Sequence, residues 1–391
     1  MSWSSLPRSQ PLPRVDKPTA PIRTGAEINQ LRPMAKVQIH VTAYNEANRI
    51  EAVVRAILEQ SFSDFTLVIH DNHSTDRTVE ICRRAAAGDR RVFIDEGSMN
   101  IGAVMQGSRV RCGYDAKYIA LRSANDLIHP DYLRETVGLL DTDPSVALAY
   151  SHGMDFRDDL ASAEPSPDGF KIDTRGMGPF AAAVEVMQRY TASFSLWGVY
   201  RRTAFESCRP YQFMHGGDHV WLAEMALYGA VAPIEGRLDY RHLPPITAQA
   251  GIVHNAKSQL EEDVRGIAEQ SFFYGVKQHL PFTDMAWGHV EMFSLARVDD
   301  ALKQNLILAA REIFRARFLP FLTDEAARFT QGVRVILENW GSEAPLRAPN
   351  QYVWLLKARK EIDKIRFLQT ADAETLCHLE DQITSVLRRL R

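Results

Sequence analysis

Short apolar runs alternate with stretches of helical apolar spacing through the first half of this chain, beginning at Lys36. The strand-like runs are residues 37–41, 65–69, 92–94 and 118–121. Between them, residues 50–58 place apolar side chains at the i, i+3, i+4 spacing of one helix face. Further helices are predicted at residues 78–87 and in a segment that reaches Arg109. These alternations predict right-handed crossovers and an α/β fold with a mainly parallel, twisted sheet flanked by helices.

Polar loops follow three of the predicted strands, at residues 42–46, 71–76 and 122–126. Open α/β sheets bind ligands beyond the carboxyl ends of their parallel strands, and these ends share one edge of the sheet. We therefore expect the three loops to converge on one crevice. Thr75 or Asp76 is expected to cap the helix that follows the second loop, because a side-chain oxygen there can accept from a first-turn N–H group.

The pattern changes along the rest of the chain. Further elements are predicted as a helix at 132–140, strands at 146–150 and 194–200, an amphipathic helix at 220–227, short strands at 231–232 and 238–240, and helices from about 255 onward. Residues 155–179 are rich in Asp, Pro and Gly and predict a long functional loop. We divide the chain into a flexible Pro-rich segment (1–34), an α/β domain (35–250) and a helical C-terminal region (251–391).

Composition excludes several classes of protein. With 45% hydrophobic and 24% charged residues and a formal net charge of -3, the chain has no electrostatic footprint for nucleic acid. No stretch of about 18 uninterrupted apolar residues is present, and a transmembrane helix is therefore not expected. The four cysteines have no metal-site spacing and suit free thiols in a reducing cytoplasm. The protein is expected to be cytoplasmic.

Several segments together resemble a known enzyme family. The quoted runs are VQIHVTAYNEANRI, TLVIHDNHSTD, NIGAVMQGSR, YIALRSANDLIHPDYL, SLWGVYRRTAF and HGGDHVWLAEMALYG, in this order. Over residues 36–245 the chain resembles the family 2 glycosyltransferases, inverting nucleotide-sugar enzymes with a GT-A fold. Each segment alone is weak evidence, but six in register are strong. The resemblance implies a GT-A-like domain that moves a sugar from a nucleotide-sugar donor to a glycan, lipid-linked or small-molecule acceptor.

The resemblance also implies residues for the donor. Tyr44 matches a position that lines the nucleotide pocket, and Asp71 matches the acid that accepts a hydrogen bond from the base, usually uracil. Ser123, Asn125 and Asp126 fall on the family's DxD-type motif, whose carboxylates hold the ribose and a divalent cation, Mg or Mn. A cation at the diphosphate stabilises the negative charge that builds on the leaving group.

Two more residues are implied on the acceptor side and near the leaving group. Asp218 falls on the acid of the acceptor-side motif and is the expected general base, because the attacking hydroxyl must lose its proton. One base and one attack give inversion at the anomeric carbon. His242 is a weaker match to a polar residue near the leaving group.

The central motif departs from the family pattern. Ser123 and Asn125 stand where many relatives have two aspartates, and Asp126 is the remaining acid. A neutral amide oxygen attracts a dication less than a carboxylate does, and metal affinity should therefore fall. Three outcomes stay open: weak cation binding through Asn125 and Asp126, metal-free catalysis helped by Arg or His, and a nucleotide-binding protein without activity. The rival function is a nucleotide-sugar sensor or scaffold.

Structural roles compete with these functional ones. Asp71 could simply cap a turn, and Tyr44 could be a packed aromatic residue. Asp218 could cap the following helix, a role compatible with that of a base, and both roles are predicted for it. The spacing of His70 and His73 invites a zinc site, but no third ligand lies at a useful spacing. Arginines near the site, Arg122 among them, are expected to be structural or solvated rather than phosphate clamps.

The C-terminal third carries two further patterns. Leu376, Leu379, Ile383, Val386 and Leu390 form a short heptad seam that could join a homodimer, although burial against the chain's own helices is favoured. Three arginines, at positions 311, 315 and 317, lie beside aromatic and leucine residues and could meet an anionic membrane, which would make the protein peripheral at the inner face. A helix face that is buried on one side and solvated on the other is the commoner outcome.

Overall fold

The computed structural model describes residues 35–101, 116–166, 171–189, 194–210, 216–243, 280–340 and 349–389. Three of the sequence predictions lie outside these residues: the Pro-rich segment, most of the helix expected to reach Arg109, and the helical pattern between 255 and 279. The expected boundary at 250 and 251 also lies outside them and stays a prediction. Among the described residues, no helix is both long and apolar enough to cross a membrane.

The main sheet has seven strands in the order β10-β6-β9-β4-β1-β2-β3. They are β1 (Val37–Ala43), β2 (Phe65–Asp71), β3 (Val92–Glu96), β4 (Tyr118–Ser123), β6 (Val146–Tyr150), β9 (Val199–Arg201) and β10 (Ala230–Pro233). Only β9 runs antiparallel to its neighbours, β4 and β6. The mainly parallel sheet predicted from the alternating pattern is therefore confirmed.

Helix α2 (Ile50–Leu58) follows β1 along the chain, α3 (Thr78–Ala86) follows β2, and α5 (Tyr132–Thr142) comes after β4, as the sequence pattern predicts. The apolar face of α2, including Val53 and Val54, packs in one core with Val37 and Ile39 of β1. Asp76 accepts hydrogen bonds from Thr78 N at 2.9 Å and from Ala47 N at 3.2 Å. The N-cap position itself is Arg77, which makes no side-chain capping bond, and Asp76 instead accepts from the first N–H group of α3 from one residue before the cap.

A second sheet of four strands, in the order β5-β11-β7-β8, lies beside the carboxyl edge of β4. Its strands are β5 (Leu127–Ile128), β7 (Gly153–Phe156), β8 (Glu164–Pro165) and β11 (Asp239–His242). The prediction of an irregular loop from 155 to 179 was therefore wrong in part, because this segment also holds a short 3-10 helix, η1 (Leu160–Ser162), and the start of α6 (Pro179–Arg189). Strands of two to four residues are too short to leave an alternating pattern in the sequence.

The single strand expected at residues 194–200 was also wrong in part. It is a 3-10 helix, η3 (Phe194–Trp197), followed by β9 and then by α7 (Arg202–Ser207). Gly198 lies between the two, and a Cβ atom there would come within 2.6 Å of the Ala149 carbonyl oxygen. This close approach explains why the apolar run changes from helix to strand at a glycine.

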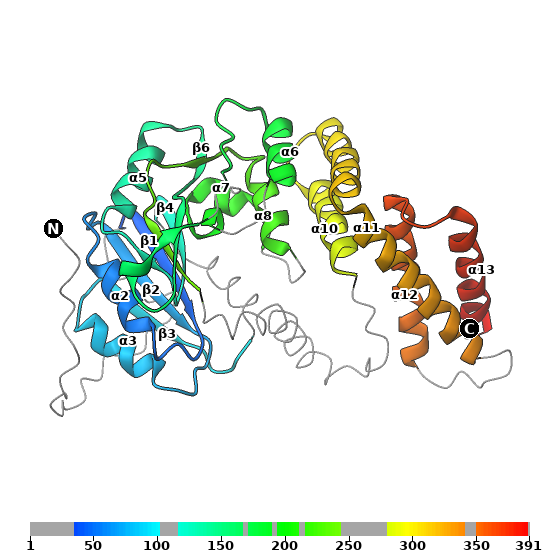
Figure 1. Ribbon diagram of the computed structural model, residues 1–391, viewed down its shortest axis with the longest axis horizontal. Helices are drawn as coiled ribbons and strands as arrows, with labels where there is room; N and C mark the ends of the chain where they lie inside the picture. The colour runs from blue at the N-terminus through cyan, green and yellow to red at the C-terminus, as the bar shows by residue number, and fades with distance from the viewer. Residues whose placement is uncertain are drawn as a thin grey trace.

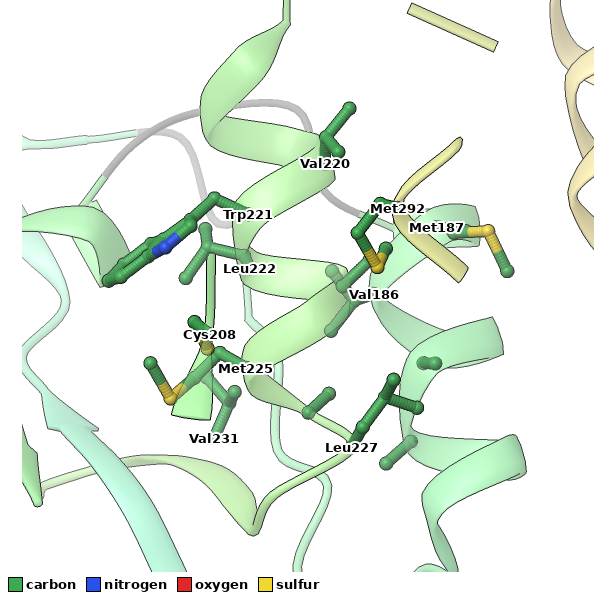
Figure 2. Close-up of a cluster of buried hydrophobic side chains, with 14 of the residues drawn as sticks. Val186, Met187, Cys208, Val220, Trp221, Leu222, Met225, Leu227, Val231 and Met292 are labelled. Atoms are coloured by element: carbon green, nitrogen blue, oxygen red, sulfur yellow. The ribbon is translucent and has the colours of Figure 1, made fainter. Parts of the chain in front are cut away.

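Helix α8 (Gly217–Met225) lies in the middle of the largest apolar core. Figure 2 shows its side chains, including Trp221 and Leu222, among those of α6 and α10. Every residue of α8 is buried except Asp218. The predicted helix is present, but its predicted amphipathic character was wrong because neighbours cover it on all sides.

From residue 280 onward, the described residues form four helices: α10 (Pro281–Leu295), α11 (Asp300–Trp340), α12 (Pro349–Leu368) and α13 (Ala373–Arg389). Figure 1 shows α12 and α13 at the opposite end of the molecule from β3, with α10 and α11 between. Helix α11 is kinked at Phe318, where φ is -129°, and Pro320 lacks the N–H that a straight helix would use.

The kink divides α11 between two cores. Before it, Leu306 and Phe314 share a core with α6 and α8. After it, Ala326, Phe329 and Val333 share a separate core with α12 and α13. The heptad residues Leu376, Leu379, Ile383 and Val386 all belong to that second core, whereas Leu390 lies outside the described residues. Burial of this seam within the chain is confirmed.

Two of the three C-terminal arginines bind the ends of helices. Arg315 Nη1 donates to the carbonyl oxygens of Leu368 and Gln369, at the end of α12. Arg317 Nη1 donates to the carbonyl oxygen of Met187 in the last turn of α6. A guanidinium there satisfies carbonyl groups that lack a partner within the helix, and it complements the helix dipole. Both arginines are therefore structural.

Candidate active site

The register of the main sheet brings the predicted loops to one edge. Strand β1 lies between β2 and β4, with Ala43 opposite Asp71 and Thr42 opposite Ser123. Neighbouring strands are about 4.8 Å apart. The loops that begin after these residues therefore lie side by side, as the sequence predicts.

Asp71 ends β2 with its carboxylate almost wholly buried, at 3% exposure. Its Oδ2 atom accepts a hydrogen bond from Ser74 N at 3.0 Å, which is the turn-capping role. Its Oδ1 atom is buried and has no hydrogen-bond partner among the described residues. An unpaired buried carboxylate oxygen costs free energy, and it offers an acceptor to a ligand that can donate.

Hydrogen bonds join the loop after β1 to the loop after β2, which contains the residues that follow Asp71. Asn45 N donates to Ser74 Oγ at 2.9 Å, and Thr75 N donates to Asn45 Oδ1 at 2.8 Å. Asn45 has a φ of 55°, in the left-handed region that asparagine tolerates better than most residues. Tyr44 is 40% exposed, and the alternative that it is a packed aromatic is therefore wrong. Its ring is accessible to a ligand where the loops after β1 and β2 meet.

The loop after β4 contains the remaining donor-side residues. Ser123 Oγ donates to Asn125 Oδ1. Asp126 is 8% exposed, and its Oδ1 atom accepts a hydrogen bond from His242 N at 2.9 Å. Burial raises the pKa of Asp126 to about 6, and the nearby Asp239 adds to the rise. The structure therefore joins Asp126 and His242, which lie 116 residues apart.

A buried ion pair supports this loop from behind. Arg122 donates to both carboxylate oxygens of Asp239, at 2.7 and 2.9 Å, and to the Trp197 carbonyl oxygen at 2.8 Å. Both side chains are 2% exposed. The prediction that Arg122 is structural is confirmed. Asp239 was missed, although an acid inside an apolar strand pattern signals a buried partner.

The donor set near Asp126 fits a weakly held cation. Asn125 and Asp126 offer an amide oxygen and a carboxylate, which are ligands that Mg and Mn accept. Burial lowers the pKa of His242, and Arg49 lowers it further; its imidazole is therefore neutral at neutral pH. In the described part of the chain, no group of three or more His, Cys, Asp or Glu side chains could hold a metal by itself. Any cation here would need oxygen atoms from a ligand.

The two histidines of the zinc alternative bind different groups. His70 Nδ1 lies 3.0 Å from Asp95 Oδ2, and His70 Nε2 lies 2.9 Å from His40 Nδ1. His73 Nδ1 lies 3.2 Å from the Gly97 carbonyl oxygen. The rings of His70 and His73 are therefore held apart by separate partners.

Asp218 lies in the first turn of α8 and is the one residue of that helix that solvent reaches. Its Oδ1 atom accepts a hydrogen bond from His219 N at 2.9 Å. The residue that caps the helix is Gly216, with a φ of 67°, and the alternative of an ordinary N-cap role for Asp218 was therefore wrong. A carboxylate in a first turn is stabilised by the helix dipole. Its role as a base stays a prediction.

Comparison with known proteins relates part of the chain to a family. Residues 38–182 match the model described as Glycosyl transferase family 2. This matched segment is similar to family 2 glycosyltransferases. The match includes Tyr44, Asp71 and the loop from Ser123 to Asp126, which are the donor-side residues predicted for such a domain.

Two relatives are each similar to part of this chain. An uncharacterized glycosyltransferase of Haemophilus influenzae is 22% identical over 116 residues, and a chondroitin synthase of Escherichia coli is 29% identical over 123 residues. These matches cover 30% and 31% of this chain. They span only 36% and 18% of the relatives' own lengths.

Solved glycosyltransferase structures share the fold. TarS of S. aureus, residues 1–349, superposes with a TM-score of 0.54 at 12% identity, covering 91% of this chain and 92% of the TarS chain. Its complex with UDP-GlcNAc also gives a TM-score of 0.54, covering 90% of this chain and 89% of that one. The predicted GT-A-like fold with a helical C-terminal region is confirmed.

Proposed function

We propose that this protein transfers a sugar from a uridine diphosphate sugar to an acceptor hydroxyl, with inversion at the anomeric carbon. The observation that carries the proposal is the buried, unpaired Oδ1 atom of Asp71 beside the exposed ring of Tyr44. Uracil has an imide N–H that can donate to this oxygen, and its flat ring suits contact with an aromatic side chain. TarS, which shares the fold, was crystallised with UDP-GlcNAc.

The leaving group would lie at the loop after β4. The backbone and side-chain groups of Ser123, Asn125 and Asp126 would bind the ribose and diphosphate, with His242 beside them. A divalent cation bound here would supply positive charge to the departing diphosphate. Because Asp126 is the one carboxylate of this motif, we propose that the cation is held weakly and mainly together with the diphosphate.

Asp218 would act as the general base. Its carboxylate is partly exposed, and it projects from a helix that is otherwise buried. A rigid support of this kind keeps a catalytic group in place without a loss of entropy at each turnover. The carboxylate would take the acceptor proton as the hydroxyl attacks the anomeric carbon. The acceptor is a glycan, a lipid-linked sugar or a small molecule.

The donor site is tested with Asp71→Asn. One of the two positions now held by carboxylate oxygens would become an NH₂ group, which cannot accept from Ser74 N or from the uracil imide. Loss of a hydrogen bond to a charged group costs about 1.5–3 kcal/mol, and we expect UDP affinity to fall by about ten- to a hundredfold in calorimetric titration. Asp64→Asn, an exposed residue before β2, is the matched control. Equal UDP affinity in wild type and Asp71→Asn would contradict the assignment.

The base is tested with Asp218→Asn. General base catalysis contributes about 10²–10⁴-fold, and we expect turnover to fall by more than about a hundredfold while UDP binding is retained. Turnover is measured as nucleoside diphosphate release from a panel of nucleotide sugars and acceptors, with and without Mn. Near-normal turnover would remove Asp218 from this role. Binding of UDP without turnover by the wild type across the panel would favour the sensor function instead.

A further inference from the structure

The helix that carries Asp218 is joined to the C-terminal part of the chain through two buried histidines. His219 Nδ1 lies 2.8 Å from His289 Nε2, which belongs to α10. His219 is 5% exposed and His289 is fully buried. Phe314 of α11 covers both rings, with ring centroids 5.7 Å from His219 and 4.7 Å from His289. Asp218 and His219 are adjacent in sequence, and their side chains leave α8 in different directions.

The hydrogen bonds of His289 define which of the two histidine rings donates and which accepts in this contact. His289 Nδ1 lies 2.8 Å from the Met285 carbonyl oxygen, which can only accept. Burial lowers the pKa of His289 to about 4, and the ring is therefore neutral near pH 7. Its one proton is then on Nδ1, and its Nε2 atom accepts from His219 Nδ1. The contact is thus a donor and acceptor pair between α8 and α10, and the backbone of Met187 in α6 is a further hydrogen-bond partner of the His219 ring.

A second contact holds the start of α8 against the same helix. Gly216, the N-cap of α8, has a φ of 67°, and a Cβ atom there would lie 2.3 Å from Met285 Sδ. Figure 2 shows Met292 of α10 beside Val186 of α6, next to the following turns of α8. Helix α10 therefore contacts α8 both before and after Asp218.

We infer that His289 is a positioning residue for catalysis, which holds Asp218 at the acceptor through its hydrogen bond to His219. This inference rests on the proposed function, because it gives Asp218 the role of base. His289 touches neither substrate nor the reacting atoms. Its effect passes through the orientation of the first turn of α8, where His219 N also donates to Asp218 Oδ1. The helical C-terminal part then contributes to turnover as well as to folding.

The test compares two replacements of His289. Leucine fills a similar volume but removes the acceptor that His289 Nε2 offers to His219 Nδ1. Glutamine keeps an amide oxygen within reach of that group. Displacement of a catalytic group by about 1 Å can cost about a hundredfold. We expect His289→Leu to lower kcat by at least about tenfold with KM for the donor unchanged, and His289→Gln to retain most of kcat. UDP binding should be unchanged in both.

A double-mutant cycle separates positioning from general loss of structure. In the Asp218→Asn background the base is already lost, and we expect His289→Leu to cause no further fall in the residual rate. A fall of the same factor in both backgrounds would overturn the inference, as would an unchanged kcat in His289→Leu alone. If the leucine variant does not fold, His289→Asn replaces it with the same expectation, because its shorter amide does not reach His219. A wild-type enzyme without transferase activity would instead overturn the proposed function.

Discussion

Replacement of Asp239 by asparagine should destabilise the protein strongly. Arg122 and Asp239 are each 2% exposed and share two hydrogen bonds of 2.7 and 2.9 Å. Burial alone would lower the pKa of Arg122, but Asp239 outweighs it and holds that pKa above its ordinary value. Arg122 therefore stays charged in Asp239→Asn, and its charge is left buried and uncompensated.

Breaking a buried ion pair from one side costs about 3–5 kcal/mol. The Trp197 carbonyl oxygen still accepts from Arg122 Nη1, which places the expected loss at the lower end, about 3 kcal/mol. The free energy of unfolding is measured by urea denaturation followed by circular dichroism. Glu80→Gln, which breaks an exposed pair with Arg77, is the control and should cause no measurable change.

The physical reason is tested by removing both charges. Arg122→Met combined with Asp239→Leu should destabilise the protein less than Asp239→Asn does, because no buried charge is left without a partner. A loss below about 1 kcal/mol in Asp239→Asn would refute the reasoning. A double variant that is less stable than Asp239→Asn would refute it as well.

Two further predictions concern residues beside this pair. The pKa of Asp126 is raised from 3.8 to about 6, and the folded state therefore binds more protons than the unfolded state between these values. The stability that this carboxyl group contributes is present below about pH 4 and is lost as the pH rises through about 6. The free energy of unfolding, measured by urea denaturation, should fall by about 3 kcal/mol over this range in the wild type, and Asp126→Asn should lack this fall. A parallel pH dependence in both proteins would contradict this. Gly153→Ala should cost about 1–3 kcal/mol, because its Cβ atom would lie 1.9 Å from the Phe194 ring; Phe194→Leu in the same chain should restore part of the loss, and no rescue would argue against a steric cause.

The edge of the main sheet could be predicted because the sequence features that indicate it, apolar strands that end in polar loops, are local. Strands β1, β2 and β4 are short segments rich in apolar residues, and polar or aromatic residues such as Tyr44 and Asp71 lie at their carboxyl ends. Parallel pairing then brings the loops together without knowledge of any side-chain contact. The family resemblance added roles to residues that the pattern had already placed.

The partners of these residues could not be predicted, because each contact joins distant segments. Arg122 and Asp239 are 117 residues apart, and His219 and His289 are 70 residues apart. Nothing in the sequence near His219 distinguishes a histidine that meets another histidine from one that meets solvent. The burial of α8 on all sides was missed for the same reason, since its cover comes from α6 and α10.

The kink at Phe318 places the two halves of α11 in two different apolar cores. Polar contacts also join α12 to the elements before the kink: Lys364 Nζ lies 2.7 Å from Asp284 Oδ1 of α10, and Arg315 Nη1 donates to the Gln369 carbonyl oxygen at 2.7 Å. Opening of α12 and α13 would therefore break these contacts as well as the second core. The far end of the chain is thereby tied to α10, the helix that contacts the start of α8.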